Sequence, residues 1–154
     1  MTALNTIRVP VESSYVLSRG GMVVSIEAAT DFDLRGKVDD AQARDKETGL
    51  RMWVVTVIDL DQVYQPDAEP GGFRRTAEVK VRVMSNQRPV PPPARVAGFG
   101  PVIEFEGLTL TPYADTSKCT GSEPGRSHRC RARLAYSLRA TGIREFSGLL
   151  STAA

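Results

Sequence analysis

The sequence predicts an all-β fold made of short antiparallel strands. Apolar residues recur mostly at every second position, and the 3.6-residue period of an amphipathic helix is nearly absent. The apolar runs are short, rich in β-branched residues, and separated by Gly, Pro, Asp and Asn. A chain of 154 residues that is 41% hydrophobic and 25% charged is expected to form one globular domain.

The first two predicted strands bracket a long polar loop. Gly21–Ala29 follows a poorly patterned N-terminal lead, residues 1–19, and the Gly20-Gly21 pair lets the backbone turn into this strand. Thr30–Gly49 carries many charges of both signs and no apolar stripe, so we expect a loop there. Leu50–Leu60 is apolar on both faces, which is typical of a central strand covered on both sides.

Three further strands are predicted in the second half of the chain. In Ala77–Val83, valines alternate with charged residues, as in a half-buried antiparallel strand whose outer face is exposed to solvent. Arg88–Pro101 holds four prolines between positions 89 and 93, and we expect an extended connector because each proline removes a backbone donor. Val102–Tyr113 should bulge or bend at Gly107, and Ala132–Thr141 is the fifth strand.

This arrangement predicts a five-stranded Greek-key barrel of the oligonucleotide-binding (OB) kind over residues 20–142. In such a barrel, the loops between strands one and two and between strands four and five flank the ligand face. Here those loops are Thr30–Gly49 and Thr116–Arg131. We expect residues 143–154 to form a flexible C-terminal tail. An immunoglobulin-like sandwich is the structural alternative, but it needs about seven strands.

Positive charge is concentrated in residues 116–133. This segment contains five basic residues and one acidic residue, whereas residues 1–115 contain 13 basic and 16 acidic residues. A concentrated basic segment favours a polyanion partner such as duplex or single-stranded DNA. The alternative is that the arginines only keep a long hairpin loop soluble.

Outward-facing lysine and arginine side chains of two predicted strands extend this positive surface. Aromatic side chains near it can stack on the bases of a nucleic acid. Such stacking is worth roughly 1–3 kcal/mol per base. For the single tryptophan, packing in the core is the alternative. Tyr136 shares its face with Leu134 and Leu138, so we expect it to be buried. The predicted nucleic-acid-binding residues are Lys118, Arg126, Arg129, Arg131, Arg133, Arg139, Lys80, Arg82, Trp53 and Tyr113.

We expect no enzymatic activity and no cofactor. The single histidine, His128, lies in a polar loop, and no Ser or Cys forms a known nucleophile signature with it. The carboxylates of Thr30–Gly49 are mixed with lysine and arginine, which favours solvation over acid and base catalysis. The glycine pairs at 20–21 and 71–72 lack the spacing of a phosphate-binding loop.

The two cysteines, Cys119 and Cys130, lie in the basic segment. With His128 they give three possible metal ligands, whereas a structural zinc site normally has four at shorter spacings. A disulfide that closes the loop and two free thiols are the other possibilities.

The sequence predicts a cytoplasmic protein with no membrane partner. No apolar run approaches the ~20 residues that cross a bilayer. Residues 1–11 also lack the basic start and apolar core of a secretory signal.

Three blocks of the sequence are similar to a known family. They are Asp45–Leu50 followed by Met52–Val55 and Asp59, then Phe105–Tyr113, and then Arg133–Gly142. Over roughly Val9–Gly142, the order and the sequences of these blocks resemble those of the plasmid replication, integration and excision activator proteins of actinobacterial integrative and conjugative elements. The resemblance implies an element-encoded protein that activates replication and excision at DNA, and it offers no catalytic residues to transfer. Thr116–Arg131 is longer and richer in cysteine than the family suggests.

Two other functions stay open. The same basic surface could protect single-stranded DNA with little sequence preference. Alternatively, the protein could be an adaptor that binds an element-encoded replication or recombination protein through Phe99, Val102 and the proline stretch, without contacting DNA.

Overall fold

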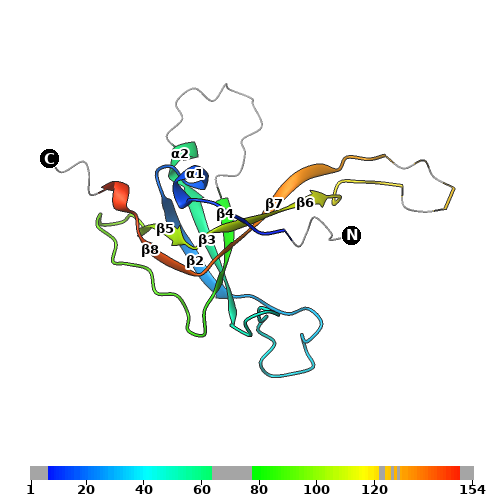
Figure 1. Cartoon of the computed structure of the whole chain (residues 1–154), viewed down its shortest axis with the longest axis horizontal. Coiled ribbons are helices and arrows are strands. Elements are labelled where there is room, and N and C mark those ends of the chain that lie inside the picture. The colour runs from blue at the N-terminus through cyan, green and yellow to red at the C-terminus, as the bar shows by residue number, and fades with distance from the viewer. Residues whose placement is uncertain (1–6, 64–77, 122–123, 126, 128, 150–154) are drawn as a thin grey trace.

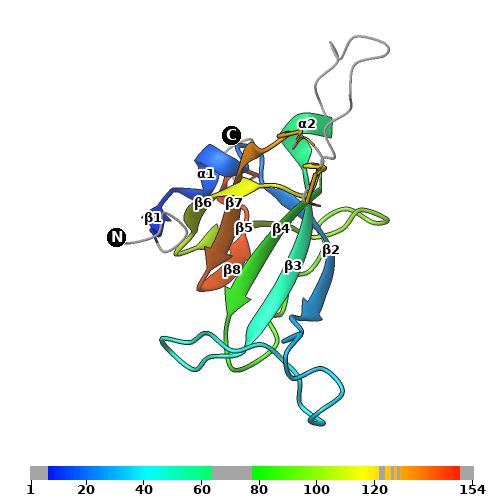
Figure 2. The ribbon, with the colours of Figure 1, turned by 90° about the vertical axis from the view of Figure 1, so that its right-hand side faces the viewer.

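The computed structural model describes residues 7–63, 78–121, 124–125, 127 and 129–149. It contains one curled eight-stranded sheet with the order β1-β6-β7-β4-β3-β2-β5-β8 (Figures 1 and 2). The all-β prediction is confirmed. The strands are β1 (Val9–Pro10), β2 (Gly21–Ala28), β3 (Met52–Asp59), β4 (Glu78–Met84), β5 (Val102–Glu106), β6 (Thr109–Asp115), β7 (Arg133–Ala140) and β8 (Gly142–Glu145).

The centre of the sheet is an antiparallel meander of β2, β3 and β4. The central strand, β3, pairs with β2 on one side and with β4 on the other, so that Val57 lies between Val23 and Val79. Val81 and Val83 of β4 are fully buried, whereas the charged residues that alternate with the valines of this strand are exposed. Both predictions, a central β3 and a solvent-exposed outer face on β4, are confirmed.

The described residues form eight strands where the sequence predicts five, partly because one predicted strand divides at Gly107. This glycine has φ +59° and separates β5 from β6, so the expected bend is present. A Cβ atom at this position would lie 2.5 Å from Thr141 Oγ1. Thr141 in turn separates β7 from β8. The segments 102–115 and 133–145 therefore bend next to each other, at Gly107 and Thr141. As a result β5 pairs with β8, and β6 pairs with β7.

Both ends of the described chain differ from the predicted lead and tail. Residues 142–145 are not a free tail but form β8, because Ile143 lies opposite Phe105 and packs against the core. In the lead, β1 pairs with β6, and the helix α1 (Ser13–Val16) lies at one end of the curled sheet (Figure 2). Leu17, which follows α1, is 1% exposed and belongs to the core.

The connector Arg88–Pro101 contains no strand or helix, as predicted. It is attached to β2 at two points. The Arg88 guanidinium donates to the Ile26 carbonyl at 2.9 Å, and the Val23 amide donates to the Pro101 carbonyl at 2.9 Å. Two short helices, α2 (Leu60–Val63) and the 3-10 helix Ser147–Leu149, complete the described chain. Within the described residues, every helix lacks the length and apolar character that crossing a bilayer requires.

The hairpin formed by β6, β7 and the segment between them projects from the body of the molecule as an arm (Figure 1). β7 pairs with β4 only at the base of the arm, where Arg82 and Val83 face Arg139 and Ala140. Farther out, β7 pairs with β6 alone. The predicted burial of Tyr136 is therefore wrong: its side chain is 54% exposed because this part of β7 extends beyond the body.

Candidate nucleic-acid interface

The outer face of β3 and β4 carries the basic side chains predicted on this sheet. Val54 lies opposite Arg82 and Thr56 opposite Lys80, while the alternate pair Val55–Val81 points into the core. Paired residues of neighbouring strands share a face, so this register directs both basic side chains outward.

A hollow of about 680 Å³ opens between β4 and the arm. It forms because β4 and β7 pair only near their C-terminal ends, at Arg82 and Arg139, and lie apart toward their N-terminal ends. We call it the arm hollow. Tyr113, which is 43% exposed, lines it together with both basic residues of β4. The full lining is Val54, Glu78, Val79, Lys80, Arg82, Tyr113, Tyr136, Ser137 and Leu138.

The two basic side chains of the arm hollow differ in their partners. Lys80 Nζ lies 3.7 Å from Glu78 Oε1 in an exposed ion pair, which is worth little in water. Among the described residues, Arg82 has no ion pair or side-chain hydrogen bond. Its guanidinium is therefore the group in this hollow that is most available to an anionic ligand.

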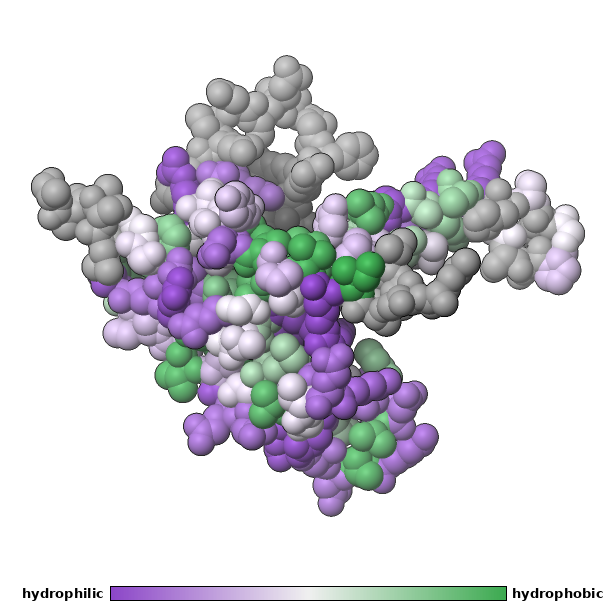
Figure 3. Space-filling view, viewed as in Figure 1, coloured by the Kyte–Doolittle hydropathy of each residue, from purple (hydrophilic) through white to green (hydrophobic). Residues whose placement is uncertain are grey.

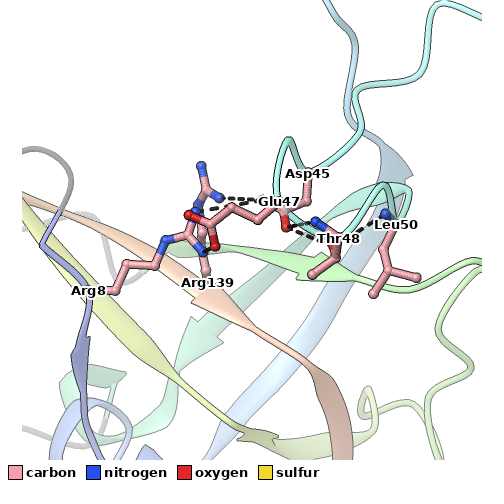
Figure 4. A network of polar contacts seen from close by, with 6 residues as sticks. All are labelled: Arg8, Asp45, Glu47, Thr48, Leu50 and Arg139. Atoms are coloured by element: carbon pink, nitrogen blue, oxygen red, sulfur yellow. Dashed lines mark hydrogen bonds and ion pairs between the residues drawn. The ribbon is translucent and has the colours of Figure 1, made fainter.

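Next to Arg82, the loop 30–49 is anchored to the arm by Asp45 (Figure 4). The Asp45 carboxylate, only 2% exposed, accepts hydrogen bonds from Thr48 N at 3.1 Å and Thr48 Oγ1 at 2.8 Å. Arg139 Nη1 lies 3.2 Å from Asp45 Oδ1, and Arg8 Nη2 lies 3.7 Å from the same oxygen. The Thr48 hydroxyl lowers the pKa of Asp45 most, burial opposes this, and the two guanidinium groups add to the lowering.

Arg139 thus helps to hold the loop 30–49 in position, and its guanidinium is less available to an anionic ligand than that of Arg82. It is 24% exposed and bonded to Asp45. Burial lowers the pKa of Arg139, and the positive charge of Arg8 lowers it further.

A second hollow, of about 510 Å³, surrounds this network and includes Arg82, which lines both hollows. Five basic and four acidic side chains line it, so its charge is nearly balanced. They are Arg8, Arg44, Lys46, Arg82 and Arg139, with Asp31, Asp33, Asp45 and Glu47. The two linings therefore carry the same net charge of +1, and the arm hollow differs in having fewer charged side chains, two basic and one acidic.

The basic residues predicted from sequence do not gather in one cradle. Lys118, Arg129 and Arg131 are exposed in the segment between β6 and β7, whereas Arg82 pairs with Arg139 at the base of the arm and Lys80 lies two residues before it on β4. Arg139 and Arg133 on β7 are six residues apart, which corresponds to about 20 Å of extended chain.

The remaining predicted basic residues of the arm are either paired or not described. The Arg133 guanidinium donates to Asp115 Oδ2 at 3.3 Å, and the side chains of Ser117 and Arg133 contribute to lowering the pKa of Asp115, Ser117 most. Arg126 lies outside the described residues. The arm therefore separates the basic side chains at its base from those nearer its tip.

Trp53 does not join the outer-face residues. It lies opposite Val83, in the same row as the core valines of β3, and is half-buried. Its indole nitrogen donates to the Ser85 carbonyl at 2.9 Å. Packing at the end of the sheet accounts for these contacts.

Cys119 and Cys130 are free thiols near the tip of the arm. The Arg131 amide donates to Cys119 Sγ at 3.3 Å. His128, the third candidate metal ligand, lies outside the described residues. Over the part of the chain that the structure describes, no three His, Cys, Asp or Glu side chains form a group that could hold a metal.

The residues proposed for an adaptor role line a separate, mostly apolar hollow of about 510 Å³. Phe99 and Val102 meet there with Phe146, which follows β8. Arg95 and Glu145 form an ion pair at this hollow. The lining also includes Leu60, Pro93, Val96 and Gly100.

Sequence reasoning missed Arg8 and the anchoring role of Asp45. Arg8 precedes a two-residue strand in a segment without a clear pattern, so nothing in the sequence marks it. Asp45 did carry a signal: an Asp three residues before a Thr-Gly pair is suited to a capped turn, and Gly49 has φ +71° here.

No family model, curated protein or solved structure matches this chain. Its function therefore has to be inferred from the side chains that the fold brings together.

Proposed function

We propose that this protein binds nucleic acid through the outer face of β3 and β4. The observation that carries the proposal is the meeting of Lys80, Arg82 and Tyr113 in one open hollow between the sheet and the arm. Arginine and lysine hold phosphates, and an exposed aromatic ring offers a surface on which a base can stack.

The proposal includes an OB-like barrel built from five strands, two of which are bent. Counting β5 with β6 and β7 with β8 as one bent strand each, the pairings connect in a ring. β2, β3 and β4 form a meander, β4 pairs in parallel with β7, and β5 pairs with both β2 and β8. In OB folds, ligands bind on the face of strands two and three, between two long loops. On this proposal the arm hollow is that ligand face: residues of the arm line it, and the loop 30–49 lines the neighbouring hollow that shares Arg82 with it.

The biological role follows from the resemblance of three sequence blocks to mobile-element activators. On this proposal the protein is a DNA-binding accessory protein that activates plasmid replication, integration and excision. It has no enzymatic role, needs no cofactor and acts in the cytoplasm. Protection of single-stranded DNA is a rival use of the same surface.

Binding can be measured by fluorescence anisotropy with a duplex and a single strand of equal length, each at two salt concentrations. An activator should prefer the duplex, and the preference should survive added salt, whereas a single-strand protector should show the opposite order. Each lost phosphate contact should lower the slope of log affinity against log salt by about one.

The informative variant is Arg82→Glu, because Arg82 lies on the outer face and its loss breaks no described contact. We expect affinity to fall at least tenfold, since a repelling charge replaces an attractive one. Lys37→Glu is the matched control: Lys37 is exposed in the loop 30–49 and lines neither hollow. Equal loss in both variants would mean that only overall charge matters, and unchanged binding in Arg82→Glu would overturn the proposed surface.

An adaptor is the second candidate function, and the apolar hollow at Phe99 favours it. An apolar cleft with a few polar groups at its edge is suited to an anchoring side chain of a partner protein. If the protein acts as an adaptor, Phe99→Ser should abolish activation of the element and Arg82→Glu should leave it unchanged. A DNA-binding activator should instead lose function in Arg82→Glu.

A further inference from the structure

The arm has one entirely apolar face over three successive pairs of residues. Leu110 faces Leu138, Pro112 faces Tyr136, and Ala114 faces Leu134. The alternate pairs on the other face are Thr109–Arg139, Thr111–Ser137, Tyr113–Ala135 and Asp115–Arg133. The arm is therefore an amphipathic two-stranded ribbon.

The apolar face is a continuation of the core surface into solvent. Leu138, at the base of the arm, packs against the core cluster. Beyond it, Tyr136 is 54% exposed and Leu134 is 65% exposed. Val9 of β1 lies opposite Leu110, on the same face, and is 41% exposed. Figure 3 shows hydrophobic surface where the arm leaves the body and again farther along it.

An uncovered face of this kind needs a physical reason. A two-stranded hairpin is at best marginally stable in water without packing on one of its faces. Contiguous exposed apolar surface on a folded protein marks an interaction site. Phosphate contacts do not account for this face, because it carries no charged side chain.

We propose that the apolar face of the arm packs against the same face of a second copy of this chain. The two arms would lie face to face about a two-fold axis, with the Leu134 and Tyr136 rows of both copies in contact. A second arm has the length, width and apolar character of the surface to be covered, so the face is complementary to itself. This inference does not depend on nucleic-acid binding.

The size of the surface indicates a reversible dimer. Seven residues of a two-stranded ribbon cover about 25 Å by about 10 Å. With the relief of the side chains and the contribution of Val9, both copies together would bury on the order of 1,000 Å², at the low end of specific interfaces. Dimerisation should therefore depend on protein concentration.

The opposite, polar face of each arm would stay free in this dimer. That face carries Tyr113 and Ser137, two of the four arm residues that line the arm hollow; the other two, Tyr136 and Leu138, lie on the apolar face. The two hollows, related by a two-fold axis, would then lie at the edges of the shared interface. A DNA-binding dimer of this kind would suit two half-sites arranged as an inverted repeat.

Sedimentation velocity over a concentration series of the full chain tests the dimer. We expect the wild type to shift from monomer to dimer as concentration rises, and Leu134→Glu to stay monomeric because two like charges would be buried together. Thr111→Glu is the matched control: it adds the same charge to the other face of the arm and should dimerise as the wild type does. Circular dichroism would show that both variants keep their strands.

A cross-linking experiment identifies the interface without disturbing the fold. In a background with both native cysteines replaced by serine, Leu134→Cys should be linked between copies by a short bis-maleimide, and Thr111→Cys should not. A direct disulfide at position 134 should not form, because sheets packed face to face lie about 10 Å apart and a disulfide needs Cα atoms within about 7 Å.

Three results would overturn the proposal. The first is a wild type that stays monomeric at every concentration, which would point to a different protein as the occupant. The second is dimerisation by Leu134→Glu equal to that of the wild type. The third is a ready disulfide at position 134, since that would show strands paired edge to edge.

Discussion

Asp45 and Arg139, separated by 94 positions in the chain, form a partly buried ion pair with 3.2 Å between Oδ1 and Nη1. The pair joins the loop 30–49 to the base of the arm. The arm lines the arm hollow, and the loop lines the neighbouring hollow that shares Arg82 with it, so this contact fixes the two hollows relative to each other.

Asp45→Asn should destabilise the protein by about 2 kcal/mol, because it removes the almost fully buried negative charge that pairs with Arg139. Urea unfolding would measure the change. A double-mutant cycle with Arg139→Met isolates the pair: the second substitution should cost less when Asp45 is already replaced. Additive losses would show that Thr48, and not Arg139, is the important partner of Asp45.

The pH dependence of stability should report the lowered pKa of Asp45. A carboxylate whose folded-state pKa lies below its unfolded value of 3.8 contributes full stability above that value, and the contribution is lost as pH falls through the folded pKa. The difference in unfolding free energy between wild type and Asp45→Asn should thus be constant near neutral pH and shrink below about pH 4. A difference that grows on acidification would contradict this assignment.

Asp59 should behave in the opposite way. Its burial raises the pKa of the carboxyl group above 3.8, so the folded state binds a proton more readily than the unfolded state and the charged form is disfavoured at neutral pH. Asp59→Asn keeps an oxygen that can accept the Asp61 amide, now 3.0 Å from Asp59 Oδ1. The variant should be more stable than the wild type at neutral pH, and the gain should vanish in acid. Thermal unfolding at several pH values measures both effects.

Much of this fold could be predicted because the central strands have strong alternation. The predicted ranges Leu50–Leu60 and Ala77–Val83 differ from β3 and β4 by one or two residues at each end. β1 escaped prediction because it has only two residues, one of them a proline. β8 escaped because its pairing with β5 depends on the bend at Thr141, which is set by tertiary contacts.

The candidate site was harder to predict than the strands. Period-two alternation assigns Tyr136 to the face of Leu138 correctly, yet it does not show where the body of the protein ends. The same pattern therefore describes a buried side chain and one on a projecting arm. The link between Arg139 and Asp45 was equally invisible, because no local pattern connects the two segments.

Gly107 should tolerate no side chain, because it combines a positive φ with a close neighbour. Gly107→Ala should cost about 2–3 kcal/mol, from backbone strain and from the contact with Thr141 Oγ1. Gly98→Ala is the matched control, since Gly98 has φ +77° but open space around its missing Cβ, and it should cost only about 1 kcal/mol. Thr141→Ala should recover part of the loss in Gly107→Ala and none in Gly98→Ala. Equal losses at both glycines would mean that the contact with Thr141 is unimportant.

The two cysteines should form a disulfide when an oxidant is supplied. Thr120 and Arg129 form an antiparallel bridge and exchange both backbone hydrogen bonds, at 3.2 and 2.9 Å, so extending this register by one residue brings Cys119 opposite Cys130. Residues in such a position have Cα atoms about 4.5 Å apart, within the range that a disulfide spans.

Treatment with oxidised glutathione should therefore convert both thiols into one disulfide and release two molecules of reduced glutathione. Intact-mass measurement should show the loss of two hydrogens per chain, reversed by reductant. Cys119→Ser should instead keep one glutathione attached to Cys130, because no second thiol is present to displace it. Stable double glutathionylation of the wild type would show that the thiols do not meet, and that the register does not continue beyond the Thr120–Arg129 bridge.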